Sequence, residues 1–281
     1  MSRIAILTDS SAYLTSDLLE RHDIHVIPLK LHWDGETLVD GVDITPQAFY
    51  YRLANHATLP STSQLSKHDF LQAFDRLADR YEGILVPLIS SGISGTVASA
   101  LAASAEFTRV PVQVVDTHST SAGLALVTLA AAQAVAQGCG LPEVTQVTRD
   151  VVQKLHLFFM VDTLKYLHKG GRIGGASRYL GSALRIKPIL FFNGEGKIDA
   201  LERVRTKRKA LERLVELAEE KAGGNPVHVG VLHANAPEEV AEFRSRLAER
   251  LKCDHVYTFE LSPVIGTHVG PGTIGLAMYV E

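Results

Sequence analysis

The chain has 281 residues, of which 46% are hydrophobic and 21% are charged, so we expect a globular protein with a substantial core. Its net charge of −3 argues against a general polyanion-binding surface, and nucleic acid is not an expected partner. The two cysteines, Cys139 and Cys253, form no CxxC pair and the twelve histidines are scattered, so neither a disulfide framework nor a metal site is expected.

The first half of the chain alternates strand-like and helix-like segments. Apolar runs at 4–7, 24–31, 84–89 and 112–115 predict strands, and segments at 16–22, 45–56, 66–81, 94–105 and 119–137 predict helices. Ser66 and Asp69 have the spacing of a capping box at the start of one such helix. This βαβα order predicts a parallel sheet covered by helices on both faces.

The alanine-rich segment 117–142 is the least charged part of the chain. Its strongly apolar stretch is only about 15 residues, shorter than the roughly 20 that span a bilayer. We therefore expect a buried helix there and no integral membrane segment. The chain begins on a strand-like run without the apolar region of a signal peptide, which favours a cytoplasmic location.

The second half has a different pattern. Residues 188–204 form two strand-like runs around an Asn-Gly turn, a hairpin signal, and a helix that ends at Gly223 follows. A strand at 227–233, a helix at 237–251 and a closing strand at 273–280 complete the pattern. We expect an α/β protein of two domains: residues 1–157 as a parallel-sheet α/β domain, and residues 158–281 as an α+β domain with a mixed or antiparallel sheet.

Four clusters of small hydroxyl residues stand out as candidate ligand contacts. Those at 8–11, 90–96 and 117–121 follow predicted strands, and the one at 60–66 precedes a helix. Ligands of open α/β sheets bind beyond the carboxyl ends of strands, and helix N-termini favour anions. Because serine and threonine are also the preferred helix N-caps, capping alone remains the alternative.

Two further features of the second half are candidates for binding a ligand or a partner. His268 lies between Gly266 and a Gly-Pro-Gly sequence, which predicts a loop histidine that can meet a ligand. Several cations crowd the start of the helix after the hairpin, among them Arg203 and Arg205, and their charge opposes the helix dipole. They form either a solvated face or a docking patch for a phosphate or an acidic partner. The basic loop 164–175 has the same two interpretations.

With these motifs in place, the sequence resembles the DegV family, bacterial fatty-acid-binding proteins that include the lipid-binding subunits of fatty acid kinase. The matching motifs run through almost the whole chain in order: ILTDSS, DGVDIT (40–45), STSQLS (61–66), ISSGISGTVASA (89–100), VVDTHSTSAG (114–123), YLHKGGRI (166–173), RVRTKRKAL (203–211) and IGTHVGPG (265–272). One position departs from the family pattern, because Leu65 stands where a proline is usual. The hydroxyls of that motif are kept.

The resemblance implies a DegV-like two-domain fold and a non-enzymatic role. It implies that Thr62, Ser94 and His268 bind the carboxylate of a long-chain fatty acid, and that Ser63, Ser91 and Gly95 lie nearby. The acyl chain would lie between the domains, with no other cofactor. The carrier would present the carboxylate to a separate ATP-dependent kinase subunit for acyl-phosphate formation in phospholipid synthesis. Arg203 and Arg205 are candidates for docking that kinase.

Hydrogen-bond chemistry is compatible with this role, because a buried carboxylate must be fully hydrogen-bonded or it protonates. Hydroxyls, a helix N-terminus and, if His268 is protonated, an imidazolium would supply those bonds. Apolar residues of the second half are candidates for the acyl tunnel, although core packing explains them equally well: Phe158, Phe159, Met160, Leu184, Ile186, Ile189, Leu190 and Phe192.

Two other functions remain open. Ser94 as nucleophile with His268 as base would make a hydrolase or acyltransferase, which needs a distant carboxylate such as Asp9 or Asp116 to orient the histidine. A regulatory module that binds another anionic small molecule is the third possibility.

Overall fold

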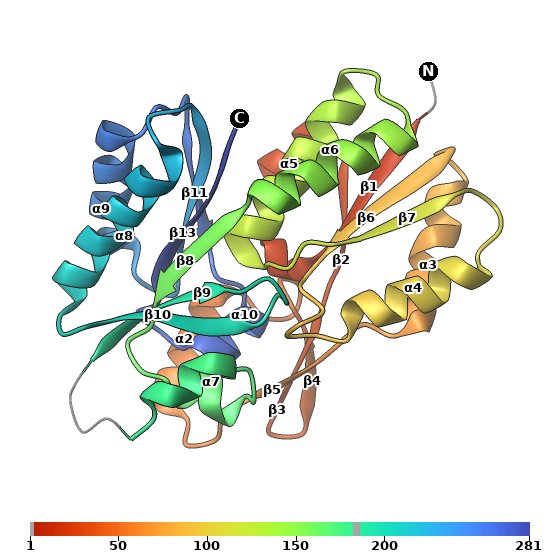
Figure 1. The fold of residues 1–281 in the computed structure, drawn as a ribbon. Coiled ribbons are helices and arrows are strands. Elements are labelled where there is room, and N and C mark those ends of the chain that lie inside the picture. The colour runs from red at the N-terminus through yellow and green to blue at the C-terminus, as the bar shows by residue number, and fades with distance from the viewer. Residues whose placement is uncertain (1–2, 182–185) are drawn as a thin grey trace.

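The computed structural model describes residues 3–181 and 186–281 and has an α/β architecture built on two main sheets. Helix α5 (Ser121–Ala136) lies between them, as Figure 1 shows, and contacts strands of both. Most of its residues are buried, on all sides of the helix. This confirms that the alanine-rich segment is a buried helix, and small side chains let both sheets approach it closely.

The first sheet is parallel, as the βαβα pattern predicts, with strand order β2-β1-β6-β7. Its strands are β1 (Ile4–Asp9), β2 (Ile24–Ile27), β6 (Gly83–Leu88) and β7 (Val112–Asp116). Both faces are covered: Ile4 and Ile6 pack in the core that contains α5, whereas Ala5 and Leu7 pack in a second core with α3 (Lys67–Ala78) and α4 (Thr96–Glu106). The capping box of Ser66 and Asp69 is present at the start of α3.

The second sheet is mixed and has the order β10-β9-β8-β13-β11-β12. Its strands are β8 (His156–Met160), β9 (Lys187–Phe192), β10 (Ile198–Val204), β11 (Val227–His233), β12 (Val256–Glu260) and β13 (Ile274–Val280). Only the β11–β12 pair is parallel. The β9–β10 hairpin confirms the Asn-Gly turn signal. Helices α8 (Lys207–Ala222) and α9 (Pro237–Arg250) cover one face of this sheet, and α5 lies against the other.

The predicted strand 24–31 is wrong in one respect, because it divides at Pro28. Residues up to Ile27 join the parallel sheet, and β3 (Lys30–Trp33) belongs to a third, antiparallel sheet with β4 (Glu36–Val39) and β5 (Ser61–Ser63). Proline has no amide to donate to a strand ladder, which favours a break at this point. The third sheet carries Thr62 toward the second half of the molecule.

The remaining elements connect or cap these layers. They are η1 (Ser10–Ala12), α1 (Ser16–Arg21), α2 (Pro46–Asn55), α6 (Leu141–Lys154), α7 (Lys165–Lys169), η2 (Gly174–Tyr179) and α10 (Pro263–Val269). Helix α6, for which the sequence analysis assigns no element, packs beside α5 (Figure 1). Among the described residues, no helix is long and apolar enough to cross a membrane.

Candidate functional site

A mainly apolar cavity lies where the carboxyl ends of the first sheet meet the second sheet and α10. It encloses about 70 Å³ of free volume, and most of the surface that lines it is apolar, as in pockets that bind organic ligands. Ile89 and Ile93 line it from the end of β6, and Leu157, Phe159 and Phe192 line it from the second sheet. The wall therefore comes from residues far apart in the sequence.

Thr62 and His268 meet in this cavity although 206 residues separate them. The Thr62 hydroxyl oxygen lies 2.8 Å from His268 Nε2, within hydrogen-bond distance. Thr62 is the central residue of β5 and pairs with Leu31 of β3, and His268 lies in the last turn of α10. The expectation that His268 lies in a loop is wrong: Ser262 caps the helix by accepting a hydrogen bond from the Ile265 amide.

Helix α10 can approach α2 closely because position 266 is glycine. A Cβ at Gly266 would lie 2.6 Å from the Tyr50 hydroxyl and 2.8 Å from the Phe49 ring. A larger side chain would thus push α10 away from α2. Since α10 carries His268, this close packing places the imidazole against Thr62.

His268 is neutral at physiological pH in this environment. Burial, reinforced by the positive charge of Arg172, lowers the pKa of the His268 imidazole to about 4. The imidazolium considered from the sequence is therefore not the resting state. Its other ring nitrogen, Nδ1, has no hydrogen-bond partner within the described residues.

Ser94 and Ser63 also line the cavity, each with a protein partner for its hydroxyl. The Ser94 Oγ lies 2.9 Å from Thr96 Oγ1 and accepts a hydrogen bond from the Thr96 amide at the start of α4. The Ser63 Oγ lies 3.0 Å from His32 Nε2. Both hydroxyls can reorient toward a ligand at small cost, because a hydroxyl both donates and accepts.

Ser91 and Gly95 are not part of the cavity wall. The Ser91 amide donates to the Asp116 carboxylate, and Gly95 is the N-cap residue of α4, packed against the Gln64 side chain. Sequence spacing places these residues beside Ser94, but the turn directs them elsewhere. Their proximity to a ligand stays a prediction from the resemblance.

Of the tunnel candidates, Phe159 and Phe192 line the cavity. Side chains alternate across a sheet, so Phe158, Met160 and Ile189 face the opposite way and pack in the core with α8 and α9. Leu190 and Ile186 belong to the core around α5 without lining the cavity, and Leu184 lies outside the described residues. Core packing is thus sufficient to explain most of the set.

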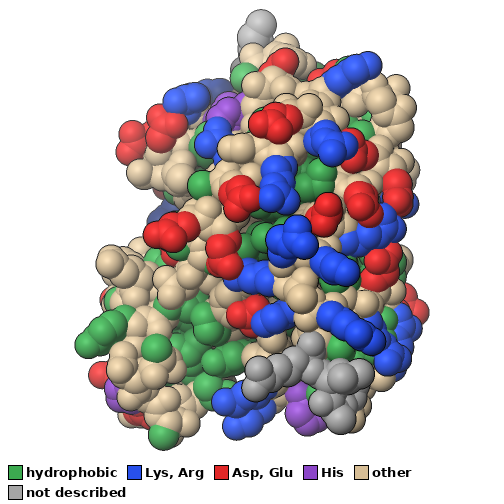
Figure 2. Space-filling model, turned by 90° about the vertical axis from the view of Figure 1, so that its left-hand side faces the viewer, with side chains coloured by type: hydrophobic (Ala, Val, Ile, Leu, Met, Phe, Trp, Pro, Cys, Tyr) green, Lys and Arg blue, Asp and Glu red, His purple; other side chains and the backbone are tan. Residues whose placement is uncertain are grey.

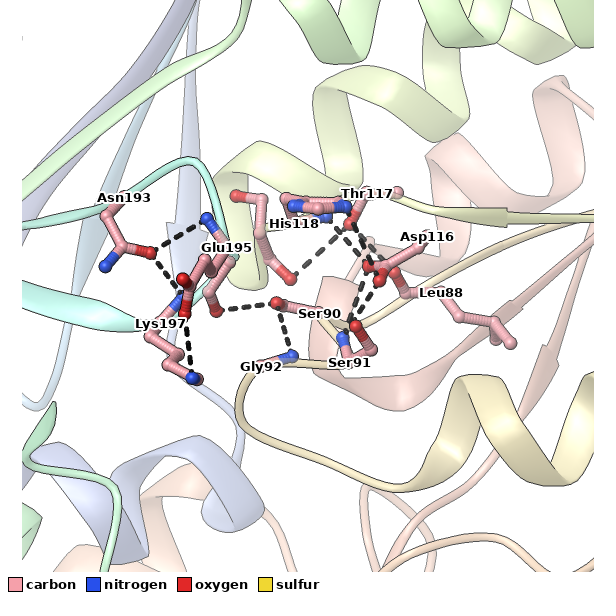
Figure 3. A network of polar contacts seen from close by, with 12 residues as sticks. Leu88, Ser90, Ser91, Gly92, Asp116, Thr117, His118, Asn193, Glu195 and Lys197 are labelled. Carbon is pink, nitrogen blue, oxygen red and sulfur yellow. Dashed lines mark hydrogen bonds and ion pairs between the residues drawn. The ribbon is translucent and has the colours of Figure 1, made fainter.

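A polar network joins the loop after β6 to the hairpin turn between β9 and β10 (Figure 3). The Ser90 hydroxyl donates to the Gly196 carbonyl oxygen at 2.6 Å. Gly92 is needed for this approach, since a Cβ there would lie 2.4 Å from that same oxygen. The Asp116 carboxylate accepts hydrogen bonds from the amides of Ser91 and His118. The bond between Ser90 and Gly196 joins the two halves of the cavity wall, and the Asp116 bonds hold the loop that carries Ser90.

The geometry does not favour a serine enzyme. No hydrogen bond joins Ser94 to His268 in the described part of the chain, since His268 Nε2 lies against Thr62. Asp116 is occupied by backbone amides, and Asp9 accepts hydrogen bonds from the amides of Ile89 and Ser11. Neither candidate carboxylate orients the histidine, so the activated nucleophile that such chemistry needs is not assembled.

The sequence analysis did not single out several residues that line the cavity. Arg172 places its guanidinium at the cavity, where its Nε donates to the Ile93 carbonyl oxygen. Thr120 and Ser121 line the cavity from the start of α5. The basic loop and the hydroxyl cluster at 117–121 were the available signals, but neither indicates which side chain faces a ligand. Within residues 3–181 and 186–281, no group of three or more His, Cys, Asp or Glu side chains is placed to hold a metal ion.

Comparison with known proteins shows that this fold is shared by the members of one protein family. The model of a family described as "uncharacterised protein, DegV family" matches residues 3–281. The Protein DegV of Bacillus subtilis is 34% identical over 275 residues, which cover 97% of this chain and 98% of that protein. A fatty-acid-binding DegV family protein from Thermus thermophilus has a similar structure with a TM-score of 0.94 at 34% identity, covering 99% of this chain and 100% of that one. The crystal structure of DegV from Bacillus subtilis, a fatty acid binding protein, gives a TM-score of 0.92 at 32% identity, with both chains fully covered.

Proposed function

Because the chain belongs to the DegV family, we propose that it is a carrier that buries a long-chain fatty acid in the cavity and holds its carboxylate at Thr62, Ser94 and His268. The observation that carries this proposal is the apolar cavity with the neutral Thr62–His268 pair in its wall. Relatives from Thermus thermophilus and Bacillus subtilis with the same fold bind fatty acids, which supports the assignment.

The head group is held by neutral donors in this proposal. In one tautomer, His268 Nε2–H donates to Thr62, and the threonine proton remains free for a carboxylate oxygen. In the other tautomer, Thr62 donates to Nε2, and the Nδ1–H is free for that oxygen. Ser94 supplies a second hydroxyl, and Ser63 lies at the same wall. The Arg172 guanidinium adds a favourable charge at the cavity without forming a dedicated ion pair. Ser91 and Gly95 would act indirectly, by shaping the turn that presents Ser94.

The acyl chain supplies most of the affinity. Each methylene transferred from water contributes about 0.8 kcal/mol, so a sixteen-carbon chain gains on the order of 10 kcal/mol before ordering costs. The hydrogen bonds at the head contribute less, since each net bond is worth about 1 kcal/mol. They fix the orientation of the acid rather than its total affinity.

We propose further that the carrier works in the cytoplasm with a separate ATP-dependent fatty acid kinase, which forms the acyl-phosphate used in phospholipid synthesis. Arg203 and Arg205 lie at the exposed junction of β10 and α8, and the Arg203 guanidinium stacks 4.5 Å from the centre of the Tyr179 ring. Figure 2 shows this side of the molecule with many Lys and Arg side chains, among which acidic ones are interspersed. An acidic face on the kinase would complement these arginines.

The two-domain division belongs to the same proposal. The strands of the parallel sheet end at Asp116, and those of the mixed sheet begin at His156. The boundary expected at 157/158 would cut β8, so we place it at the junction of α6 and β8 instead. The acyl chain would then lie between the domains, against walls from both.

Native mass spectrometry of the purified protein tests the carrier function. We expect a co-purified long-chain acid, released on denaturation, and nanomolar to micromolar rebinding after delipidation. Delipidated, folded protein that binds no acid of 14 to 20 carbons would refute the proposal. A serine-reactive probe should leave Ser94 unlabelled in the same preparation, whereas labelling would favour the enzyme.

Kinase docking is tested by charge reversal. Arg205→Glu should lower kinase-coupled turnover at limiting carrier while fatty-acid affinity stays unchanged, because the residue lies outside the cavity wall. The matched control is Arg149→Glu on α6, another exposed arginine. Equal turnover for both variants and the parent protein would contradict the docking role.

A further inference from the structure

Buried polar atoms without a hydrogen-bond partner indicate where a ligand or water must supply one. Among the described residues, three such atoms belong to side chains that line the cavity: His268 Nδ1, Thr120 Oγ1 and Ser121 Oγ. The first lies at the proposed carboxylate site. The other two form a separate pair at the beginning of α5, and the carboxylate site does not use them.

The start of α5 is suited to bind an oxygen atom. Thr120 is the N-cap residue, and its side chain makes no capping hydrogen bond to the first turn. Both side chains are deeply buried, with Thr120 7% exposed and Ser121 1% exposed. Helix α5 has 16 residues, so its N-terminus carries the partial positive charge that favours an electron-rich ligand atom.

The surroundings of this hydroxyl pair are those of an acyl tunnel. Leu157 and Phe192 line the same cavity, and they also line a neighbouring cavity of about 420 Å³ together with residues 117–119. Figure 3 shows Thr117 and His118 at the end of β7, facing the hairpin turn that follows Phe192. The start of α5 therefore lies on the side of the first cavity that adjoins the second.

A plain hydrocarbon chain cannot satisfy these two hydroxyls. Each polar group that stays buried without a partner costs free energy, whereas an oxygen on the ligand would restore the hydrogen bond. Hydroxyl groups are the simplest such substituent, because they can donate to one hydroxyl and accept from the other.

We propose that Thr120 and Ser121 form a second polar subsite, which binds a hydroxyl group on the acyl chain, so that hydroxylated long-chain acids are the preferred ligand class. The inference rests on the proposed fatty-acid-binding function and adds a specificity-determining site to it. Thr62 and His268 hold the carboxylate, and the start of α5 selects the oxygenated position.

Calorimetric titration of delipidated protein tests this inference. The ligands are hexadecanoic acid and a series of hydroxyhexadecanoic acids with the hydroxyl at successive positions from carbon 8 to carbon 16. We expect one position, or two adjacent ones, to bind about three- to tenfold tighter than hexadecanoic acid, as one net hydrogen bond provides. Other positions should bind more weakly than the parent acid, because they bury an unpaired hydroxyl.

The decisive variant is Thr120→Val, which removes the hydroxyl but keeps the side-chain shape, and valine suits the extended backbone of this residue. It should abolish the preference for the hydroxylated acid and bind hexadecanoic acid at least as tightly as the parent protein does. Thr128→Val is the matched control on the same helix, because Thr128 is buried away from the cavity and donates to the Leu124 carbonyl oxygen. It should leave the preference intact.

Three outcomes would overturn the inference: no hydroxyl position binds tighter than hexadecanoic acid, Thr120→Val weakens both classes equally, or Thr128→Val abolishes the preference as fully as Thr120→Val does. Failure of the proposed function has a different signature, since then neither class of acid binds. A carboxylate that binds at α5 instead would also be visible: Thr120→Val would weaken every acid while Thr62→Val weakens none.

Discussion

Asp40 is a buried carboxyl group whose ionisation the fold opposes, and its replacement by asparagine gives a clear prediction. The side chain is 2% exposed and lies close to the N-terminus of α10. Burial, with a contribution from nearby Asp9, raises the pKa of the Asp40 carboxyl from 3.8 to about 7 although the Ser10 hydroxyl donates to it at 2.6 Å. The group therefore stays protonated in the folded protein at pH values where the unfolded chain has lost the proton.

The sign of the effect follows from proton linkage. Between about pH 4 and pH 7 the folded state holds one more proton than the unfolded state, so the free energy of unfolding falls as the pH rises. A difference of about three pKa units corresponds to about 4 kcal/mol, reached above pH 7. The side chain introduced by Asp40→Asn cannot ionise, and its carbonyl oxygen can still accept the hydrogen bond from Ser10.

Urea denaturation of the parent protein and Asp40→Asn at pH values from 4.5 to 8.5 measures this difference. Relative to the parent, the free energy of unfolding of the variant should rise by about 3 kcal/mol between pH 4.5 and pH 8, and this difference should change little above pH 8. Asp17→Asn, at an exposed carboxylate of α1, should reproduce the parent profile. Parallel pH profiles for Asp40→Asn and the parent would refute the reasoning.

Three further substitutions test the cavity and its walls. Thr62→Val should weaken fatty-acid binding about threefold to thirtyfold in calorimetry, because it removes one hydroxyl at the head group and leaves His268 Nε2 without its partner; unchanged affinity would contradict the placement of the carboxylate. Gly92→Ala should lower the free energy of unfolding by about 2 kcal/mol or more, because the new Cβ would lie 2.4 Å from the Gly196 carbonyl oxygen in the hairpin turn. In the control Gly194→Ala, the new Cβ would have no atom within 4 Å, so the free energy of unfolding should change by less than about 0.5 kcal/mol. Phe192→Ala removes a wall that two cavities share, so the optimum acyl-chain length in a binding series should increase by about two to four carbons; a shorter optimum would contradict that role.

The layered part of the fold was predictable because apolar periodicity reports burial directly. Helix α5 is apolar on every side, and β1 opens with four apolar residues and is buried throughout, as a helix between two sheets and a central parallel strand require. Helix α10 was not predicted, because its glycines resemble those of a loop. Its signal was local: Ser262 followed by Pro263 is a capping residue before a proline at the first helical position. Gly266 is required by the close packing of α10 against α2, and it does not form a turn.

The site shows where local sequence information ends. The hydroxyl clusters could be assigned to strand ends from their positions alone, and the first three of them do gather: the Ile89 amide donates to Asp9, and the Ser90 amide donates to the Ser119 carbonyl oxygen. The contact between Thr62 and His268 depends on how the third sheet and α10 pack, so it followed only from the family resemblance. Side-chain direction on β8 and β9 likewise depends on strand register, which divides the tunnel candidates between two opposite faces.

A neutral head-group site has a consequence for how the carrier could release or present its ligand. A permanent ion pair would stabilise the carboxylate strongly and would be costly to leave unpaired after transfer of the acid. His268 is neutral without ligand, since burial and Arg172 lower the pKa of its imidazole to about 4. A carboxylate placed beside the ring would raise that pKa toward its ordinary value, because an opposite charge favours the imidazolium. An ionised carboxylate thus strengthens its own binding at the head-group site by favouring protonation of His268. Without ligand, His268 is neutral at physiological pH, so the cavity contains no unpaired imidazolium.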